Sequence, residues 1–393
     1  MGARTKDFEI VTVADESAAT PEVSVSTPKT RYTWLKLLKP THHWVGASLS
    51  VVLLISALTG AALAFRTQVD PLVYPTMLTA STCPQPISVD QVVANAVTHH
   101  PQSRVSYVRV QNRPAQPWIV RFKDRDAVHV DPCTGQVLGT QNRYGGLYGF
   151  IELVHTAKYV PNGNILIGSI TMLFAIVLLG GGIALWWPRG ANKFSHALRI
   201  HPQSKGRARL MSVHRIAGAY AAAALLVLAL TALPQAFDWA KDGIYAATNS
   251  TPPTIPAATA PTVGGPRVSL QSVWETAVRL SPNPVEHLIH VDQAPGKALE
   301  TFIIEADAPH VHARSYLFVD PVDGKVVSYE PYGSSNIGRK IYYWTMALHM
   351  GKFGGLAGQF VMLLLAAVIA LIVTTGVTTF FQRRRNSKRT AAA

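Results

Sequence analysis

Long apolar runs alternate with polar stretches along this chain of 393 residues. Four runs, at residues 44–65, 164–187, 211–237 and 356–381, reach the length of about 20 residues that a helix needs to cross a bilayer. The third run is rich in alanine and leucine, as a buried core helix would be, but its length and flanking charges favour a membrane span. The pattern predicts an integral membrane protein with a four-helix transmembrane bundle.

Basic residues flank the apolar runs. They lie before the first run, between the second and third, and after the fourth: Lys29, Arg31, Lys36, Lys39; Arg189, Lys193, Arg199, Lys205, Arg207, Arg209; Arg383, Arg384, Arg385, Lys388, Arg389. The positive-inside rule places these segments, and so both termini, in the cytoplasm. We expect a multi-pass protein of the bacterial inner membrane, in contact with lipids. The first apolar run starts too late and is too long for a cleaved signal peptide.

The two long polar stretches resemble each other. Each begins with a helical segment (88–93 and 269–274), continues with a strand-like run (118–122 and 301–304) and ends in a strand–turn–strand signal around Asp-Pro-x-x-Gly (128–137 and 317–327). Both are predicted to be small periplasmic α+β modules. Cys83 and Cys133 lie in the first, outside the cytoplasm, where a structural disulfide persists.

The predicted organisation follows from these patterns. It comprises a cytoplasmic tail (1–40), the first span (41–66), the first module (67–146), the second span with an outer extension (147–188), a basic cytoplasmic loop (189–210), the third span (211–237), the second module with a Pro/Thr-rich linker (238–340), the fourth span with an outer extension (341–382) and a second tail (383–393).

The spans repeat as well. His42 aligns with His214 at an offset of 172 residues, which also matches Thr59 with Thr231. His155 aligns with His349 at an offset of 194, which also brings Gly182 onto Gly376 and Arg189 onto Arg383. The chain is therefore interpreted as a tandem, parallel duplication of helix, outer module and helix.

Four histidines occupy matched ends of these helices. His42 and His214 begin odd spans at the cytoplasmic side, whereas His155 and His349 precede even spans at the outer side. Ionisable groups near membrane depth are usually functional, and bundle cofactors are held by side chains on facing helices. Pairs of imidazoles without a nearby thiolate suit axial ligation of haem iron, whereas a zinc site normally has three or four protein ligands. Hydrogen-bonded interfacial anchors are the alternative interpretation.

Two details of the pairs stay open. His43 is adjacent to His42 and is an alternative inner ligand. The sequence Pro-Asn-Gly at 161–163 is expected to break the helix that carries His155, so that the outer site lies at or above the lipid headgroups.

The other histidines predict weaker sites. His310 and His312 are expected on one face of a strand, with His287 and His290 nearby in sequence, and a polar strand face is favoured over a metal or substrate site. The pair at 99–100 is interpreted as a helix end, and His196 and His201 as basic-loop residues.

Composition narrows the functional classes further. The formal net charge is +14, with 15% charged residues, but the basic residues flank membrane spans, so no nucleic-acid partner is expected. Two cysteines are too few for an iron–sulfur cluster. The chain carries no nucleotide-binding motif, so electrons would come from a partner or a diffusible reductant.

The His-x-x-x-Gly openings of the odd spans, the two Asp-Pro-x-x-Gly-x-Val segments and the Trp-Trp-Pro-Arg end of the second span resemble the PepSY-associated transmembrane family. This family includes iron-regulated inner-membrane proteins and ferrioxamine-type siderophore reductases. The resemblance implies two periplasmic PepSY modules and two b-type haems near opposite membrane faces. Their ligands would be His42 and His214 inside and His155 and His349 outside, with no catalytic residue separate from the haem. The chain departs from the family at His43, where a basic residue is usual.

The expected activity is therefore haem-dependent reduction of a periplasmic Fe(III)-siderophore, which releases Fe(II), with electrons from a cytoplasmic or quinone-pool donor. Two alternative functions remain compatible with the sequence. The modules would bind an envelope partner, with the helices as anchors, or the haems would deliver electrons to another periplasmic enzyme.

Overall fold

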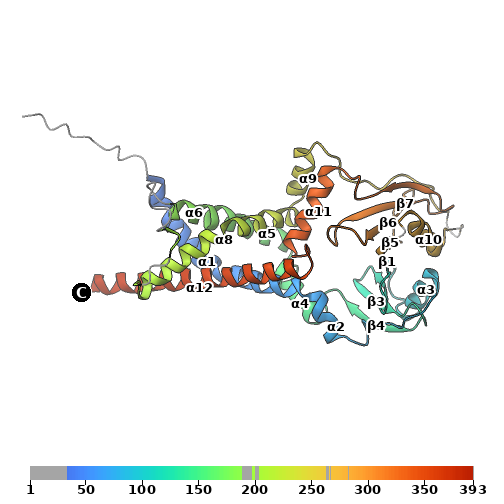
Figure 1. The fold of residues 1–393 in the computed structure, drawn as a ribbon, viewed down its shortest axis with the longest axis horizontal. Helices are drawn as coiled ribbons and strands as arrows, with labels where there is room; N and C mark the ends of the chain where they lie inside the picture. Colours follow the sequence, from blue (N-terminus) through green and yellow to red (C-terminus); the bar gives the residue numbers. More distant parts are fainter. Residues whose placement is uncertain are drawn as a thin grey trace, which may run out of the picture.

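The computed structural model describes residues 33–187, 197–199, 203–262, 265, 267–281 and 283–392, with side chains to residue 387. The molecule is elongated, with a helical bundle at one end and a head built around a β-sheet at the other (Figure 1). The predictions for His196 and His201 lie outside the described residues.

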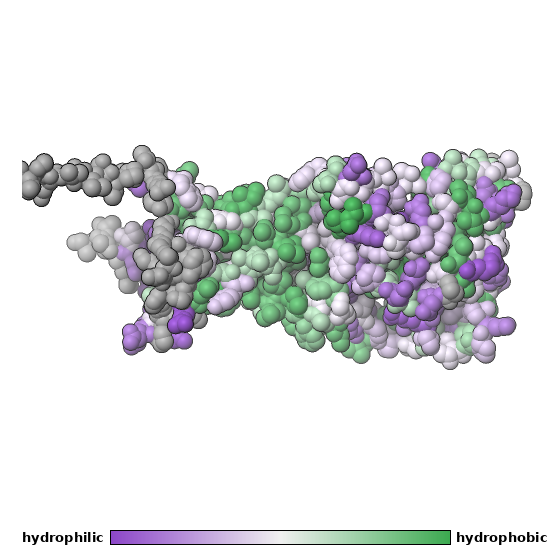
Figure 2. Space-filling view, turned by 45° about the horizontal axis from the view of Figure 1, so that its top comes forward, coloured by the Kyte–Doolittle hydropathy of each residue, from purple (hydrophilic) through white to green (hydrophobic). Residues whose placement is uncertain are grey.

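Four helical segments are long and apolar enough to cross a membrane. They are α1 (Thr33–Ala64), the composite of α5 (Gly163–Leu173), a π-helical turn η1 (Phe174–Gly180) and α6 (Gly181–Trp186), then α8 (Gly206–Ala236) and α12 (Leu356–Ala392). The chain is thus a multi-pass membrane protein. Figure 2 shows the apolar belt that these helices form beside the more polar head.

The bundle is held by contacts of α12 with α1 and α8, and of α5 with α8. Leu179, Leu225 and Leu365 are buried between the helices, whereas Leu58, Leu230 and Leu364 are more than half exposed. An apolar surface this broad around a bundle is typical of helices that face lipid.

The head contains one antiparallel sheet of eight strands in the order β4-β3-β2-β1-β5-β6-β7-β8. The strands of the first half are β1 (Val105–Gln111), β2 (Trp118–Phe122), β3 (Asp126–Val130) and β4 (Val137–Asn142). Those of the second half are β5 (Pro284–His290), β6 (Leu299–Glu305), β7 (Arg314–Val319) and β8 (Val326–Glu330).

The two modules, expected as separate units, share this sheet. Strand β1 pairs with β5, with Tyr107 opposite His290 and Gln111 opposite Glu286. Each module alone would leave an unpaired edge strand, and pairing the two edges satisfies their backbone groups. The modules therefore form one hydrogen-bonded body.

Helices cover both faces of the sheet. On one face α3 (Val89–His99) and α10 (Leu270–Leu280) enclose a core that includes Val92, Val120 and Val273. Each of these helices starts at a serine whose hydroxyl accepts a hydrogen bond from the backbone three residues later. On the other face, α11 (Ile337–His349) packs against Tyr316 and Phe318.

Short helices connect the head to the bundle. The helices α2 (Arg66–Val73) and α9 (Asp238–Ala247) follow α1 and α8, and α4 (Gly146–Thr156) leads into α5. The order helix, four strands, helix thus occurs twice, as α3-β1-β2-β3-β4-α4 and as α10-β5-β6-β7-β8-α11.

The two Asp-Pro-x-x-Gly segments form the expected turns. The Asp131 carboxylate accepts hydrogen bonds from the backbone nitrogens of Cys133 (2.7 Å) and Ser81 (2.8 Å), and Asp320 does the same with Val322 (2.9 Å) and Thr259 (2.9 Å). These bonds, led by that from Thr259, lower the pKa of Asp320 to about 2. Gly135 and Gly324 both have φ of +74°, which only glycine adopts freely.

Cys83 and Cys133 form a disulfide, with Cα atoms 5.7 Å apart. The bond ties the segment before α3 to the turn after β3.

Candidate functional site

The inner histidines come from two spans and face each other. His42 of α1 and His214 of α8 have ring centroids 6.3 Å apart, and the ring planes cross at 88°. An ion that binds one nitrogen of each of two opposed imidazoles, at about 2 Å, places the ring centroids roughly 6 Å apart. The separation therefore fits a metal held between the two rings.

The Nδ1 atoms of both rings are already occupied. His42 Nδ1 lies 3.2 Å from the carbonyl oxygen of Val177, and His214 Nδ1 lies 2.9 Å from that of Ile372. A carbonyl only accepts, so each Nδ1 donates its proton and each Nε2 is left with a lone pair. Val177 belongs to the π-helical turn, where regular backbone pairing is interrupted and a carbonyl is available.

Glycines leave room for these rings. A Cβ atom at Gly182 would lie 3.2 Å from Cε1 of His42, and one at Gly376 would lie 3.0 Å from Cε1 of His214. Real Cβ contacts are seldom this close, so larger residues would displace the imidazoles. The two glycines matched by the internal repeat thus leave space for a histidine ring in each half of the chain.

A cavity of about 690 Å³ opens beside the inner pair. Its volume lies in the range of about 300–1,000 Å³ that small-molecule and cofactor sites have. Gly46 and Gly218 line it; a Cβ at Gly218 would meet nothing within 4 Å, and one at Gly46 would make only an ordinary contact with Leu178, at 3.6 Å. The charged residues of its lining, apart from the histidines, are all cations: Lys39, Arg207, Arg215 and Arg383. A ligand with an apolar body and anionic groups fits this lining.

His43 also lines the cavity, but its geometry differs from that of His42. Its ring contacts the ring of His42 at a centroid distance of 6.2 Å, whereas the ring contact of His214 is with His42. Among the described residues, the carbonyl partner that orients an imidazole at this end of α1 belongs to His42.

The outer histidines also form a pair. His155 at the end of α4 and His349 at the end of α11 have ring centroids 6.4 Å apart. His155 Nδ1 lies 3.0 Å from Thr59 Oγ1 and near the carbonyl of Ser56, and His349 Nδ1 lies 3.3 Å from the carbonyl oxygen of Leu228. Ser56 and Leu228 are related by the same offset of 172 residues that relates His42 to His214.

The segment that carries His155 combines a helix break with a contact to the first span. The helix break is present, because α4 ends at Thr156, Asn162 has φ of +56°, and α5 starts only at Gly163. However, α4 packs against α1. His155 therefore lies beside Thr59, five residues or about 7 Å before the end of α1.

The two pairs lie at opposite ends of the bundle. His42 and Thr59, which mark their levels on α1, are 17 residues apart, or about 26 Å along a helix. This is close to the roughly 30 Å thickness of the hydrocarbon core.

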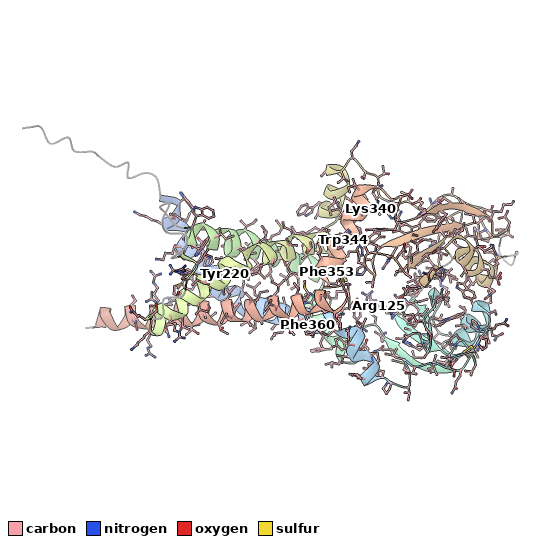
Figure 3. The ribbon with its side chains drawn as sticks, viewed as in Figure 1. Arg125, Tyr220, Lys340, Trp344, Phe353 and Phe360 are labelled. Carbon is pink, nitrogen blue, oxygen red and sulfur yellow. A yellow bond between two sulfur atoms is a disulfide. The ribbon has the colours of Figure 1, made fainter. Side chains whose placement is uncertain are left out.

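The remaining histidines do not join these pairs. His310 and His312 lie in the loop before β7 and not on a strand, which corrects the expectation. Burial lowers the pKa of each to about 4. The ring of His310 contacts that of Trp344, with centroids 4.6 Å apart, where the bundle meets the head (Figure 3). His287 and His290 lie on opposite faces of β5, while α3 ends at His99 as predicted.

Sequence reasoning did not identify the groups that orient the rings. Thr59 was seen only as a repeat match with Thr231, and the carbonyls of Val177, Ile372, Ser56 and Leu228 carry no side-chain signal. The match of Gly182 with Gly376 was the signal available, since both proved to lie against histidine rings.

A family model described as the PepSY-associated TM region matches residues 40–383. No curated protein matches the chain. Because the family model covers most of the chain, the protein belongs to the PepSY-associated transmembrane family.

Proposed function

We propose that the protein is a di-haem b electron-transfer protein of the bacterial inner membrane. It would reduce an Fe(III)-siderophore in the periplasm and so act as a ferric-siderophore reductase. The observation that carries the proposal is the geometry of the inner pair. Two imidazoles with free Nε2 atoms, 6.3 Å between centroids, border a cavity of about 690 Å³ with cations at one end.

The residues fit haem better than a lone metal ion. Each pair supplies two neutral nitrogens, whereas a protein zinc site normally has three or four ligands. The cavity provides apolar walls for a macrocycle, and Lys39, Arg207, Arg215 and Arg383 complement its two carboxylates. Haem bound between such imidazoles supplies reversible one-electron chemistry at its iron.

The protein's own residues position this chemistry. The backbone carbonyls at Nδ1 fix the tautomer and plane of three rings, and Thr59 adds a hydroxyl at the fourth. The placement of the two pairs at opposite ends of α1 provides one electron-transfer site near each membrane face.

The proposed reaction needs an external electron donor. A cytoplasmic or quinone-pool reductant would give one electron at the inner site, and the outer site would pass one electron to the Fe(III)-siderophore. Fe(III) becomes Fe(II), which oxygen-rich siderophores hold much less tightly, so the metal is released for uptake. No acid–base residue is required for this outer-sphere step.

The head and the bundle each take part in the proposal. The two sheet halves are proposed to be PepSY modules produced by a tandem duplication, on the periplasmic side of the membrane, with both termini in the cytoplasm. The repeated order of elements and the basic residues beside the inner histidines support this orientation.

Histidine variants test the proposal. His214→Ala is expected to remove one of two haems per chain, and His349→Ala the other, by pyridine haemochrome assay of the detergent-purified protein. His99→Ala alters an exposed histidine at the end of α3 and is the matched control. Stopped-flow reoxidation of the dithionite-reduced protein by ferrioxamine, with a ferrous chelator present, is expected to be lost in His349→Ala and kept in His99→Ala.

The outcomes separate the alternatives. Two haems that ferrioxamine does not reoxidise would favour electron delivery to another periplasmic enzyme. A folded protein that binds no haem would contradict the redox proposal and favour an envelope-binding role for the modules.

A further inference from the structure

A second group of metal-ligating side chains lies in the head, separate from the two histidine pairs. His100 Nε2 is 2.7 Å from Asp124 Oδ2 and 3.8 Å from Asp126 Oδ2. The three ligand atoms all lie within 4.8 Å of one another. His100 follows the last residue of α3, and the two aspartates flank Arg125, labelled in Figure 3, in the turn between β2 and β3.

We propose that His100, Asp124 and Asp126 bind a first-row divalent cation of the Zn²⁺, Fe²⁺ or Mn²⁺ class. Imidazole and carboxylate are the ligands that these ions share, and Ca²⁺ or Mg²⁺ would call for oxygen ligands alone. Donor atoms around a tetrahedral ion at about 2.1 Å lie roughly 3.4 Å apart. The two measured distances from His100 Nε2 each differ from this value by less than 1 Å.

The atoms that would not bind the ion are held by neighbours. Asp126 Oδ1 accepts a hydrogen bond from Asn142 Nδ2 (2.6 Å), and Asp124 Oδ1 accepts one from the backbone nitrogen of Asp126 (3.2 Å). His100 Nδ1 lies 2.8 Å from the side-chain amide of Gln102. When Nε2 binds a metal, Nδ1 carries the proton, and a turned Gln102 amide presents its oxygen to accept it.

The charges of the cluster favour a cation. Among the described residues, neither aspartate has a Lys or Arg ion pair, since the nearby ammonium of Lys123 pairs with Asp292. Two carboxylates thus share one imidazole. The His100 side chain is 6% exposed, but that of Asp124 is 38% exposed, so an ion and its water ligands can enter from solvent.

The second half of the sheet lacks these groups. Ser281 occupies the C-terminal cap of α10, where His100 caps α3. Aligning the two Asp-Pro turns places Ala313 and Ser315 where the first half has Asp124 and Asp126. The site therefore belongs to the first half alone and does not depend on the proposed haem function.

Zn²⁺ binding to the full-length, tag-free purified protein tests the proposal by isothermal titration calorimetry. We expect one equivalent to bind, with affinity reduced at least tenfold in Asp126→Asn and in His100→Gln. Asp126→Asn keeps the hydrogen bond between His100 and Asp124, so the fold should persist, as circular dichroism would show. Asp307→Asn, in an exposed turn of the second half, is the control and should bind as the wild type does. Absent binding in the wild type, or equal binding in all variants, would overturn the proposal.

Discussion

Replacing single glycines beside the histidine rings should weaken haem binding at one site only. A Cβ at Gly182 would lie 3.2 Å from Cε1 of His42, and one at Gly60 would lie 3.0 Å from Cε1 of His155. Carbon atoms prefer separations of about 3.5–4.0 Å, so each ring must move by roughly 0.3–1 Å. Ligands generally need to stay within about 0.5 Å of their productive position.

The expected loss follows from these distances. Overpacking by one methyl group costs about 1–3 kcal/mol, and disturbing the groups around a metal ligand typically lowers metal affinity about 10- to 100-fold. We expect Gly182→Ala to weaken haem binding tenfold or more at the inner site and Gly60→Ala to do so at the outer site. Each variant should leave the other haem in place.

Gly180→Ala is a matched control two residues from Gly182. Its Cβ would meet only the carbonyl oxygen of Ala175, at 3.4 Å, and the position is exposed. Replacing glycine by alanine in a helix stabilises the helix by about 1 kcal/mol in both variants, so this effect cancels when the two are compared. Haem titration of the apo-protein, followed by absorption, measures the affinities. Equal haem affinity in Gly182→Ala and Gly180→Ala would refute the placement of the His42 ring.

Three further predictions concern other parts of the molecule. Replacing both Cys83 and Cys133 by serine opens a loop with a sequence separation of 50. In the chain-entropy model this lowers the free energy of unfolding by about 4 kcal/mol. Hydrogen exchange should therefore show weaker protection of β1–β3 than in the wild type. Unchanged protection would contradict this. His287 is fully buried with neither ring nitrogen hydrogen-bonded among the described residues, and burial lowers its pKa to about 4. The protein therefore loses stability as the pH falls from 6.5 toward 4, because protonating this buried ring is costly. His287→Leu should flatten the pH dependence of thermal unfolding in this window, and it should raise stability at pH 7 by about 1–3 kcal/mol because it removes two unsatisfied polar atoms. An unaltered pH profile would refute the prediction. Thr59→Val removes the hydroxyl 3.0 Å from His155 Nδ1 and should shift the reduction potential of the outer haem in a redox titration. Thr231→Val is the control and should cause no shift, because the hydroxyl hydrogen bonds described for Thr231 go to backbone carbonyls. Equal shifts in the two variants would contradict the prediction.

Much of the architecture could be predicted because it depends on local patterns. The four spans follow from the length of apolar runs, and the turns at Asp131 and Asp320 follow from the conformational limits of proline and glycine. The pairing of His42 with His214 and of His155 with His349 followed from the repeat and the even number of spans, since topology places matched ends together.

The remaining features depend on contacts that leave little trace in sequence. The pairing of β1 with β5 joins the edge strands of the two modules, which are about 180 residues apart in the chain. Hydrophobic alternation predicts a strand but not the strand with which it pairs. The position of His155 beside Thr59 depends on how α4 packs on α1, and the Val177 carbonyl is available through a π-helical turn with no side-chain signature. His100, Asp124 and Asp126 are separated by a strand in the chain, so only folding brings them together.

The haem content of the purified protein tests the central claim most directly. Oxidised and dithionite-reduced absorption spectra, with a pyridine haemochrome count, should give two low-spin b-type haems per chain, one of which is lost in His214→Ala and the other in His349→Ala. A folded protein that stays colourless after haem is supplied would contradict the claim that these histidine pairs are haem ligands.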